Sequence, residues 1–175
     1  MTRKKEQVQI ISQEQLAEGV FSMWIQTEAA KAAKPGQFIS MYTNDGTKLL
    51  PRPISICEID REGGALRVVY RVTGEHTGTE QFSRMKAGDN LFIVGPLGNG
   101  FPLERAKGKK AFLMGGGIGV PPILELAKEL DISQGLAYKM IAQWNEELRA
   151  KGYTTVGGRV SRRYYQEKIY GAGEE

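Results

Sequence analysis

Six short segments between residues 5 and 100 alternate apolar and polar residues, which is the pattern of half-buried strands. Turn-forming residues separate neighbouring segments, as at Glu18–Gly19, Pro35–Gly36 and Gly63–Gly64. Short strands at such close spacing predict a small antiparallel Greek-key barrel, and a short helix is expected at GTEQFSRM. The six predicted strands are VQII, VFSMWIQT, residues 37–43, RPISICEID, ALRVVYRV and GDNLFIVGPLG.

The pattern changes after residue 103. A predicted buried strand at residues 111–114 runs into GGGIG, and Pro121 or Pro122 suits the first turn of a following helix. That helix has one apolar face, formed by Ile123, Leu126, Ala127 and Leu130. A strand, a glycine turn and a helix begin a nucleotide-binding domain, which needs roughly 100 further residues, whereas 40 follow Gly135. We therefore expect a truncated α/β segment over residues 104–130, after a barrel domain over residues 1–103.

Composition excludes several classes of protein. Cys57 is the only cysteine, so the chain cannot form an internal disulfide or build a zinc or iron–sulfur site from several thiolates, and Cys57 itself is expected to be a buried apolar residue. No apolar run approaches the roughly 20 residues of a membrane span. The basic start, MTRKKEQVQI, lacks the apolar core of a signal peptide. We expect a cytoplasmic protein with no membrane partner.

Two stretches, RPISI and YRVTGEHTGT, carry residue types that suit an anionic ligand on the barrel. Arg52 offers a planar fork of donors to a phosphate, and Pro53 restricts the backbone beside it. Ser55 has a small hydroxyl that can reach a ring heteroatom. Gly78 permits close approach to a pyrophosphate, and Thr79 opens the short helix.

In this order, PGQF, LLPRPISI, VVYRV, GT, GPLGNGF and GGGIGVPP resemble the ferredoxin-reductase superfamily over residues 5–128. Within it, the chain resembles the electron-transfer subunits of class 1B dihydroorotate dehydrogenases. The resemblance implies an FAD-binding barrel that moves electrons from NADH, through FAD and a 2Fe–2S cluster, to a partner catalytic dehydrogenase subunit in pyrimidine biosynthesis. The implied FAD-binding residues are Arg52, Pro53, Ile54, Ser55, Tyr70, Arg71, Val72, Gly78 and Thr79.

The same resemblance makes GGGIGVPP the first turn of an NAD domain, with Gly115, Gly116, Gly117 and Gly119 close to the cofactor. One strand and one helix would enclose NADH poorly, so we favour a glycine turn kept as structure. The cysteine cluster of the family is missing, so we expect no iron–sulfur cluster. The sequence leaves open whether the chain is an enzyme; if it is, it is a flavin-dependent oxidoreductase subunit.

Residues 124–171 also resemble small helix-turn-helix proteins of phages and mobile elements, which predicts a third, α-helical part over residues 124–175. Ala127, Ile132, Ala137 and Met140 have the spacing at which such helices pack on each other. In this interpretation Gln134, Tyr138 and Lys139 face a major groove, and Arg159, Arg162 and Arg163 contact phosphates. A solvated amphipathic helix with a basic tail has the same charge pattern.

The sequence therefore leaves two functions open. In the first, the chain is an FAD-binding electron-transfer subunit with an incomplete NAD domain. In the second, it is a DNA-binding regulator or excisionase-like protein on a reductase-like barrel. The junction near Leu124–Leu130 fits a natural fusion, a frame error or an artificial chimera equally well.

Overall fold

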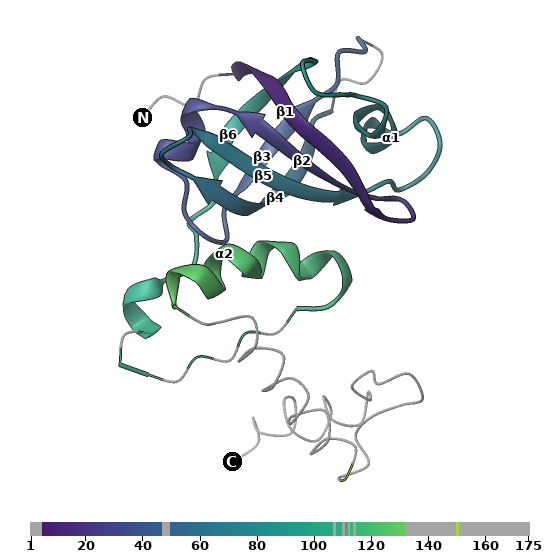
Figure 1. Cartoon of the computed structure of the whole chain (residues 1–175). Coiled ribbons are helices and arrows are strands. Elements are labelled where there is room, and N and C mark those ends of the chain that lie inside the picture. The colour runs from purple at the N-terminus through teal and green to yellow at the C-terminus, as the bar shows by residue number, and fades with distance from the viewer. Residues whose placement is uncertain are drawn as a thin grey trace. The chain divides into compact units, whose positions relative to one another are not determined.

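Six antiparallel strands close into a barrel in the first part of the chain (Figure 1). The computed structural model describes residues 5–46, 50–106, 108–109, 111, 113, 115–131 and 150. The chain divides into two compact units, Met1–Asp131 and Ile132–Glu175, and the fold described here is that of the first unit. The strands are β1 (Lys5–Ala17), β2 (Val20–Gln26), β3 (Phe38–Tyr42), β4 (Arg52–Asp60), β5 (Ala65–Arg71) and β6 (Asn90–Leu97).

The order around the barrel is β1-β2-β5-β4-β3-β6, with β6 closing onto β1. Chain neighbours β2 and β3 are thus separated by β5 and β4, which confirms the predicted antiparallel barrel with crossed connections. Alternation along the strands sends one face inward, and this face forms the core. The fully buried core includes Ile10, Met23, Ile25, Ile39, Met41, Ile56, Leu66, Val68, Leu91 and Ile93.

Short helices cover the ends of the barrel. Helix α1 (Gly78–Ser83) begins at the predicted glycine, and its Phe82 is fully buried in the core. Helix α2 (Pro121–Glu129) begins at Pro121, as predicted. The 3-10 helices are η1 (Glu28–Lys31), η2 (Leu103–Ala106) and η3 (Gly117–Gly119).

The buried strand predicted at residues 111–114 is not found at the two positions that the structure describes. Ala111 and Leu113 are half-buried but carry no strand pairing, and Phe112 and Met114 lie outside the described residues. A strand needs a hydrogen-bonded neighbour, and in the described part of the chain every strand belongs to the six-stranded barrel. Ala111 and Leu113 have no such neighbour, although the sequence around them has the composition of a strand.

Helix α2 packs on β4 through a face that differs from the predicted apolar face. Leu126 is buried as expected, whereas Ile123, Ala127 and Leu130 are only half-buried. The most buried residue of the helix is Glu125, which is 4% exposed. Its Oε2 accepts a 3.0 Å hydrogen bond from the Ile59 amide of β4. The hydrogen bond from the Ile59 amide therefore satisfies the Glu125 carboxylate in its buried position between α2 and β4.

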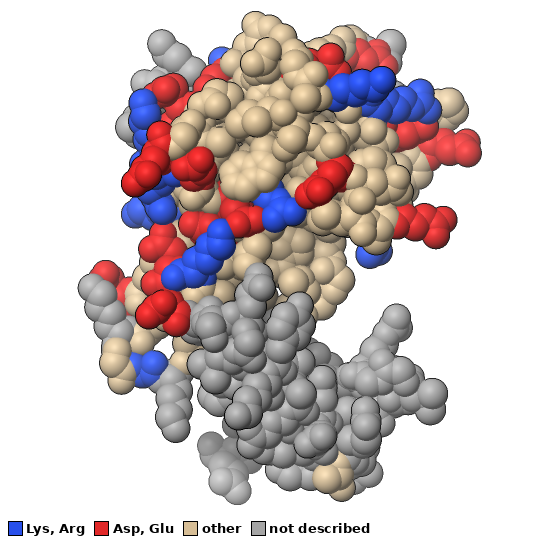
Figure 2. All heavy atoms as spheres, in the orientation of Figure 1, with Lys and Arg blue, Asp and Glu red and all other residues tan. Residues whose placement is uncertain are grey.

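Ion pairs on the outside of the barrel also join α2 to β4. Lys128 of α2 bonds to Glu58, and Glu58 also pairs with Arg67 of β5. Burial disfavours the charged form of Glu58, but the hydrogen bonds from Lys128 and Arg67 outweigh it and lower the pKa of this carboxyl. On the face shown in Figure 2, acidic and basic side chains are interspersed, so this view of the described part has no extended area of one charge.

Candidate functional site

The start of β4 and the start of α1 meet at Arg52 and Gly78. A Cβ atom added to Gly78 would lie 3.0 Å from Arg52 Nε and 3.2 Å from Arg52 Cγ. It would also lie 3.2 Å from Thr43 Cγ2. The missing side chain therefore lets the arginine lie directly against the helix backbone. Arg52 and Gly78 thus bring the two predicted phosphate-binding stretches together.

Arg52 is half-buried, and its guanidinium is held in place from one side. One of its nitrogens donates a 3.0 Å hydrogen bond to the Leu50 carbonyl. A guanidinium has five N–H donors in a planar fork, and this bond uses one of them. The group thus combines a fixed position with donors for a further acceptor, which is the arrangement that phosphate recognition requires.

The loop before α1 is organised by threonine hydroxyls. Thr77 caps the helix and accepts a hydrogen bond from the Glu80 amide. The Thr79 hydroxyl is buried and contacts the Thr77 hydroxyl at 3.1 Å, and it accepts a 3.2 Å bond from the Thr73 amide. The Thr79 side chain therefore supports the loop, and only the backbone of Thr79 is placed to serve a ligand.

The remaining RPIS residues alternate along β4. Pro53 and Ser55 are exposed and lie opposite Ser40 and Phe38 of β3. Ile54 is half-buried and packs against the core. The structure thus places Arg52 at the α1 end of the barrel and leaves the Ser55 hydroxyl accessible on the strand surface.

Tyr70 lies in the core. Its ring stacks on Phe21 at 5.9 Å and meets Phe82 edge-on at 6.1 Å, and burial raises the pKa of its phenol. Its hydroxyl donates a 2.8 Å hydrogen bond to Gln13 Oε1. Because this side chain is enclosed, only the main chain of Tyr70 could contact a ligand.

Arg71 and Val72 follow Tyr70 at the end of β5. Arg71 is exposed and lies opposite Val20 of β2. The Val72 amide is already bonded to the Gly19 carbonyl at 2.8 Å. Of the three predicted residues of this strand, Arg71 alone presents a side chain that is both polar and accessible.

The four glycines of GGGIG have two different environments. A Cβ on Gly115 would lie 2.9 Å from the Gly119 carbonyl oxygen and 2.8 Å from Ile123 Cδ1, so this glycine is required by packing. A Cβ on Gly116, Gly117 or Gly119 would have no heavy atom within 4 Å. Gly117 also has a positive φ of 54°. The turn therefore has one structural glycine and an open backbone beside it.

Cys57 is buried, as the sequence predicted. Burial, with a further contribution from neighbouring Glu58, raises the pKa of its thiol to about 11. The described residues contain no group of three or more His, Cys, Asp or Glu side chains that could hold a metal. A 2Fe–2S cluster requires several thiolate ligands, and the expectation that this chain binds none stays a prediction.

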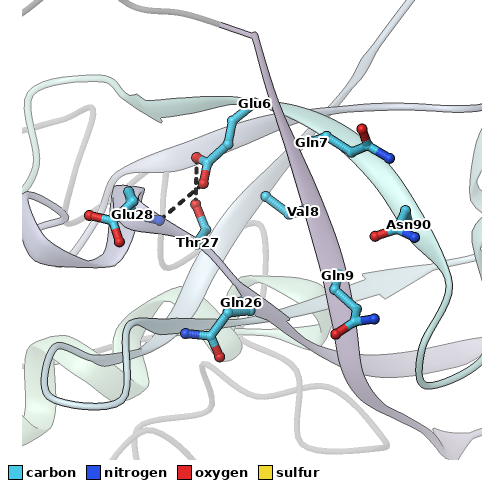
Figure 3. Close-up of a pocket in the computed structure, with 8 residues that line it drawn as sticks. All are labelled: Glu6, Gln7, Val8, Gln9, Gln26, Thr27, Glu28 and Asn90. Carbon is cyan, nitrogen blue, oxygen red and sulfur yellow. Dashed lines mark hydrogen bonds between the residues drawn. The ribbon is translucent and has the colours of Figure 1, made fainter.

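A shallow polar groove of about 480 Å³ lies elsewhere on the barrel, between β1, β2, η1 and β6 (Figure 3). The Glu6 carboxylate spans its edge, accepting bonds from the Thr27 hydroxyl at 2.7 Å and the Glu28 amide at 3.1 Å. Its polar lining consists of carboxylates, amides and a hydroxyl, which do not suit a phosphate. The full lining is Glu6, Gln7, Val8, Gln9, Gln26, Thr27, Glu28 and Asn90.

The predicted DNA-contacting residues lie outside the described part of the chain, so that assignment stays a prediction. They are Gln134, Tyr138, Lys139, Arg159, Arg162 and Arg163. The described end of the region, α2, packs on the barrel through Glu125 and Leu126. None of the helices among the described residues is long and apolar enough to span a membrane.

No protein-family model matches the chain. The chain is 43% identical over 163 residues to the electron transfer subunit of dihydroorotate dehydrogenase B (NAD(+)) of Enterococcus faecalis, a match that covers 88% of this chain and 61% of that protein. It is 42% identical over 144 residues to the subunit of the same name from Streptococcus mutans, covering 82% of this chain and 55% of the relative. The chain thus spans about three fifths of the length of these curated relatives.

The match to the Enterococcus protein extends beyond the barrel and α2. The first compact unit is 131 of 175 residues, or about 75% of the chain, whereas the match covers 88%. The similarity to these subunits therefore continues into the region for which the sequence had also indicated a helix-turn-helix.

The fold has its own counterpart among solved structures. A ferredoxin NADP+ reductase from Neisseria gonorrhoeae, solved with bound FAD and NADP, superposes with a TM-score of 0.57 over 74% of this chain and 52% of that one, at 18% identity. The barrel described above therefore has the ferredoxin-reductase fold, and the chain that forms it is similar in sequence to electron transfer subunits of dihydroorotate dehydrogenase B.

Proposed function

We propose that this chain binds FAD on its barrel and transfers electrons between a partner dehydrogenase subunit and a nicotinamide cofactor. The observation that carries the proposal is the approach of the Arg52 guanidinium to the backbone of Gly78, which a Cβ at Gly78 would obstruct at 3.0 Å. This arrangement fits the pyrophosphate of a dinucleotide, because it places a planar cation beside the first turn of α1. The bound FAD of the Neisseria reductase, which has the same fold, supports the choice of ligand.

Each predicted residue has a definite part in this proposal. Arg52 and the backbone of Gly78 and Thr79 hold the phosphates. Ser55, with Pro53 beside it, orients the isoalloxazine, and Arg71 offers a second cation. Ile54, Tyr70 and Val72 contribute main chain and packing. When bound, the isoalloxazine would supply the redox chemistry, and the protein would supply position and charge.

We infer the electron donor and acceptor from the relatives. Their name states an electron transfer subunit of an NAD(+)-dependent dihydroorotate dehydrogenase, and NAD+ is an oxidant, so a catalytic dehydrogenase subunit is the proposed electron donor and NAD+ the proposed acceptor. This direction is the reverse of the one expected from the sequence. In this proposal the nicotinamide cofactor meets the open backbone at Gly116, Gly117 and Gly119, where a Cβ would have no heavy atom within 4 Å. No iron–sulfur step is included, because the chain supplies one cysteine.

The visible absorption spectrum of the purified protein tests this proposal, before and after addition of FAD. Bound flavin bands are expected, and Arg52→Ala should lose most of them. Arg105→Ala is the matched control, because Arg105 is an exposed arginine of η2 and its loss changes the net charge equally. A folded wild-type protein that takes up no FAD would overturn the proposal, and subsequent addition of NADH tests electron exchange with the nicotinamide separately, by flavin bleaching.

A further inference from the structure

A bulge in β1 changes which side chains of this strand face the barrel interior. Ile10 pairs with Ile25 of β2, but Ser12 pairs with Trp24 and Gln13 with Met23, so one extra residue is accommodated between Ile10 and Ser12. Met23 is fully buried. Because directly opposed residues of an antiparallel pair project from the same face, Gln13 is turned toward the side of the sheet that α1 covers.

There the Gln13 amide binds the end of α1 and the segment that follows it. Its Nε2 lies 2.7 Å from the Met85 carbonyl oxygen, 3.0 Å from that of Phe82 and 3.2 Å from that of Ser83. Phe82 and Ser83 belong to the last turn of α1 and Met85 follows it, so the two N–H groups of one side chain are shared among three carbonyls at the end of the helix. The Phe82 carbonyl also accepts a 3.0 Å bond from the Met85 amide. The other end of the amide, Oε1, accepts the hydroxyl hydrogen bond from Tyr70.

The amide is therefore fixed on both sides, and so is α1. Tyr70 holds Gln13 from the core, and its ring contacts Phe82 of the same helix. Helix α1 has six residues and is about 9 Å long, at about 1.5 Å per residue. A displacement of its last turn must move its first turn, where Gly78 lies against Arg52.

We propose that Gln13 is a positioning residue for FAD: by binding the C-terminal carbonyls of α1, it sets the distance between Gly78 and Arg52 and hence the affinity for the FAD phosphates. This inference rests on the proposed function. Gln13 does not contact the FAD phosphates itself and acts through α1. It thereby assigns a role in cofactor affinity to a strand outside the two motifs that the sequence singled out.

Gln13→Glu tests the proposal, because a carboxylate retains the acceptor for Tyr70 but puts negative charge against three carbonyls. Gln15→Glu is the matched control: it makes the same charge change on the same strand, and the exposed Gln15 side chain donates to the nearby Ala17 carbonyl at 3.2 Å rather than to α1. The FAD dissociation constant is measured by titration for wild type, both variants and Arg52→Ala. We expect Gln13→Glu to weaken FAD binding about tenfold or more and Gln15→Glu to leave it unchanged.

A double-mutant cycle separates positioning from general destabilisation. If Gln13 acts through the Gly78–Arg52 geometry, Gln13→Glu should weaken FAD binding much less in the Arg52→Ala background than in wild type. Additive losses, or equal affinity of Gln13→Glu and wild type, would overturn the inference while the proposed function stands. A wild-type protein that takes up no FAD overturns both. If Gln13→Glu does not fold, Gln13→Met, which has no charge and a similar length, takes its place in the same cycle.

Discussion

The buried Glu125 of α2 accepts a 3.0 Å hydrogen bond from the backbone amide of Ile59 on β4. Burial raises the pKa of this carboxyl. The hydrogen bond from the Ile59 amide and the positive charges of Lys128 and Arg61 act to lower it, but they do not outweigh burial. The raised pKa means that folding favours the protonated form. The contribution of Glu125 to stability is therefore fully present below the pKa of the unfolded chain and is lost as the pH rises through the folded pKa.

Glu125→Gln should remove this pH dependence, because a glutamine keeps an acceptor for Ile59 and does not titrate. We expect wild type to lose unfolding free energy through Glu125 as the pH rises from 5 to 8. The variant should lack this loss, so its unfolding free energy at pH 8 should be higher, relative to its own value at pH 5, than that of wild type. Urea unfolding at both pH values measures this. Glu125→Ala provides the contrast, since it leaves the Ile59 amide without its acceptor and should cost about 1–3 kcal/mol at both pH values. An unchanged pH difference in Glu125→Gln would show that the carboxyl is not responsible.

Glu58 should have the opposite pH dependence. Its pKa is lowered in the folded state, because bonds from Lys128 and Arg67 outweigh the effect of burial. Its stabilising contribution is thus present above the unfolded pKa and is lost as the pH falls through the folded pKa. Glu58→Gln should flatten the acid side of the stability profile, measured by urea unfolding between pH 3 and pH 6. The idea fails if wild type and variant lose stability in parallel over that range.

Gly78→Ala should weaken FAD binding without unfolding the barrel. The new methyl group would lie 3.0 Å from Arg52 Nε, and displacing the guanidinium should lower FAD affinity about tenfold. Gly46→Ala is the control, because a Cβ there has no heavy atom within 4 Å and the residue has no positive φ. Fluorescence titration of FAD measures both variants. Equal affinity of Gly78→Ala and wild type would contradict the site.

Cys57 should be unreactive in the folded protein. With its pKa raised to about 11, the thiolate would be about a thousandth of the population at pH 8, and the side chain is buried. A thiol reagent should therefore modify the native protein slowly and the urea-unfolded protein rapidly and stoichiometrically. Rapid labelling of the native protein would show that this part of β4 is more open than the structure describes.

Much of the barrel follows from local sequence. Alternation places Val8 and Ile10 on one face of β1, and likewise Ile39 and Met41 on one face of β3. The turns are marked by Pro35–Gly36 and Gly63–Gly64. Glycine at position 78 and proline at position 121 likewise mark the starts of two helices correctly. These features depend on neighbours in the chain, so the sequence alone contains the necessary information.

The side chains that join separate elements could not be predicted in this way. The amphipathic pattern of α2 predicted an apolar inner face, but the unpaired amide of Ile59 selects Glu125 for the interior. Nothing local to Gln13 indicates that it would bind α1, since the bulge that turns it inward is defined only by pairing with β2. Ala111 and Leu113 were predicted to be part of a strand from the composition of their segment, but they have no strand pairing, and a strand forms only where another strand supplies its hydrogen bonds. The sequence by itself determined which segments are strands and helices of the barrel and which residue types could hold a phosphate. Only the tertiary structure decided that Arg52 meets Gly78 and that Glu125 and Gln13 hold the helices, because those contacts depend on the register and packing of segments far apart in the chain.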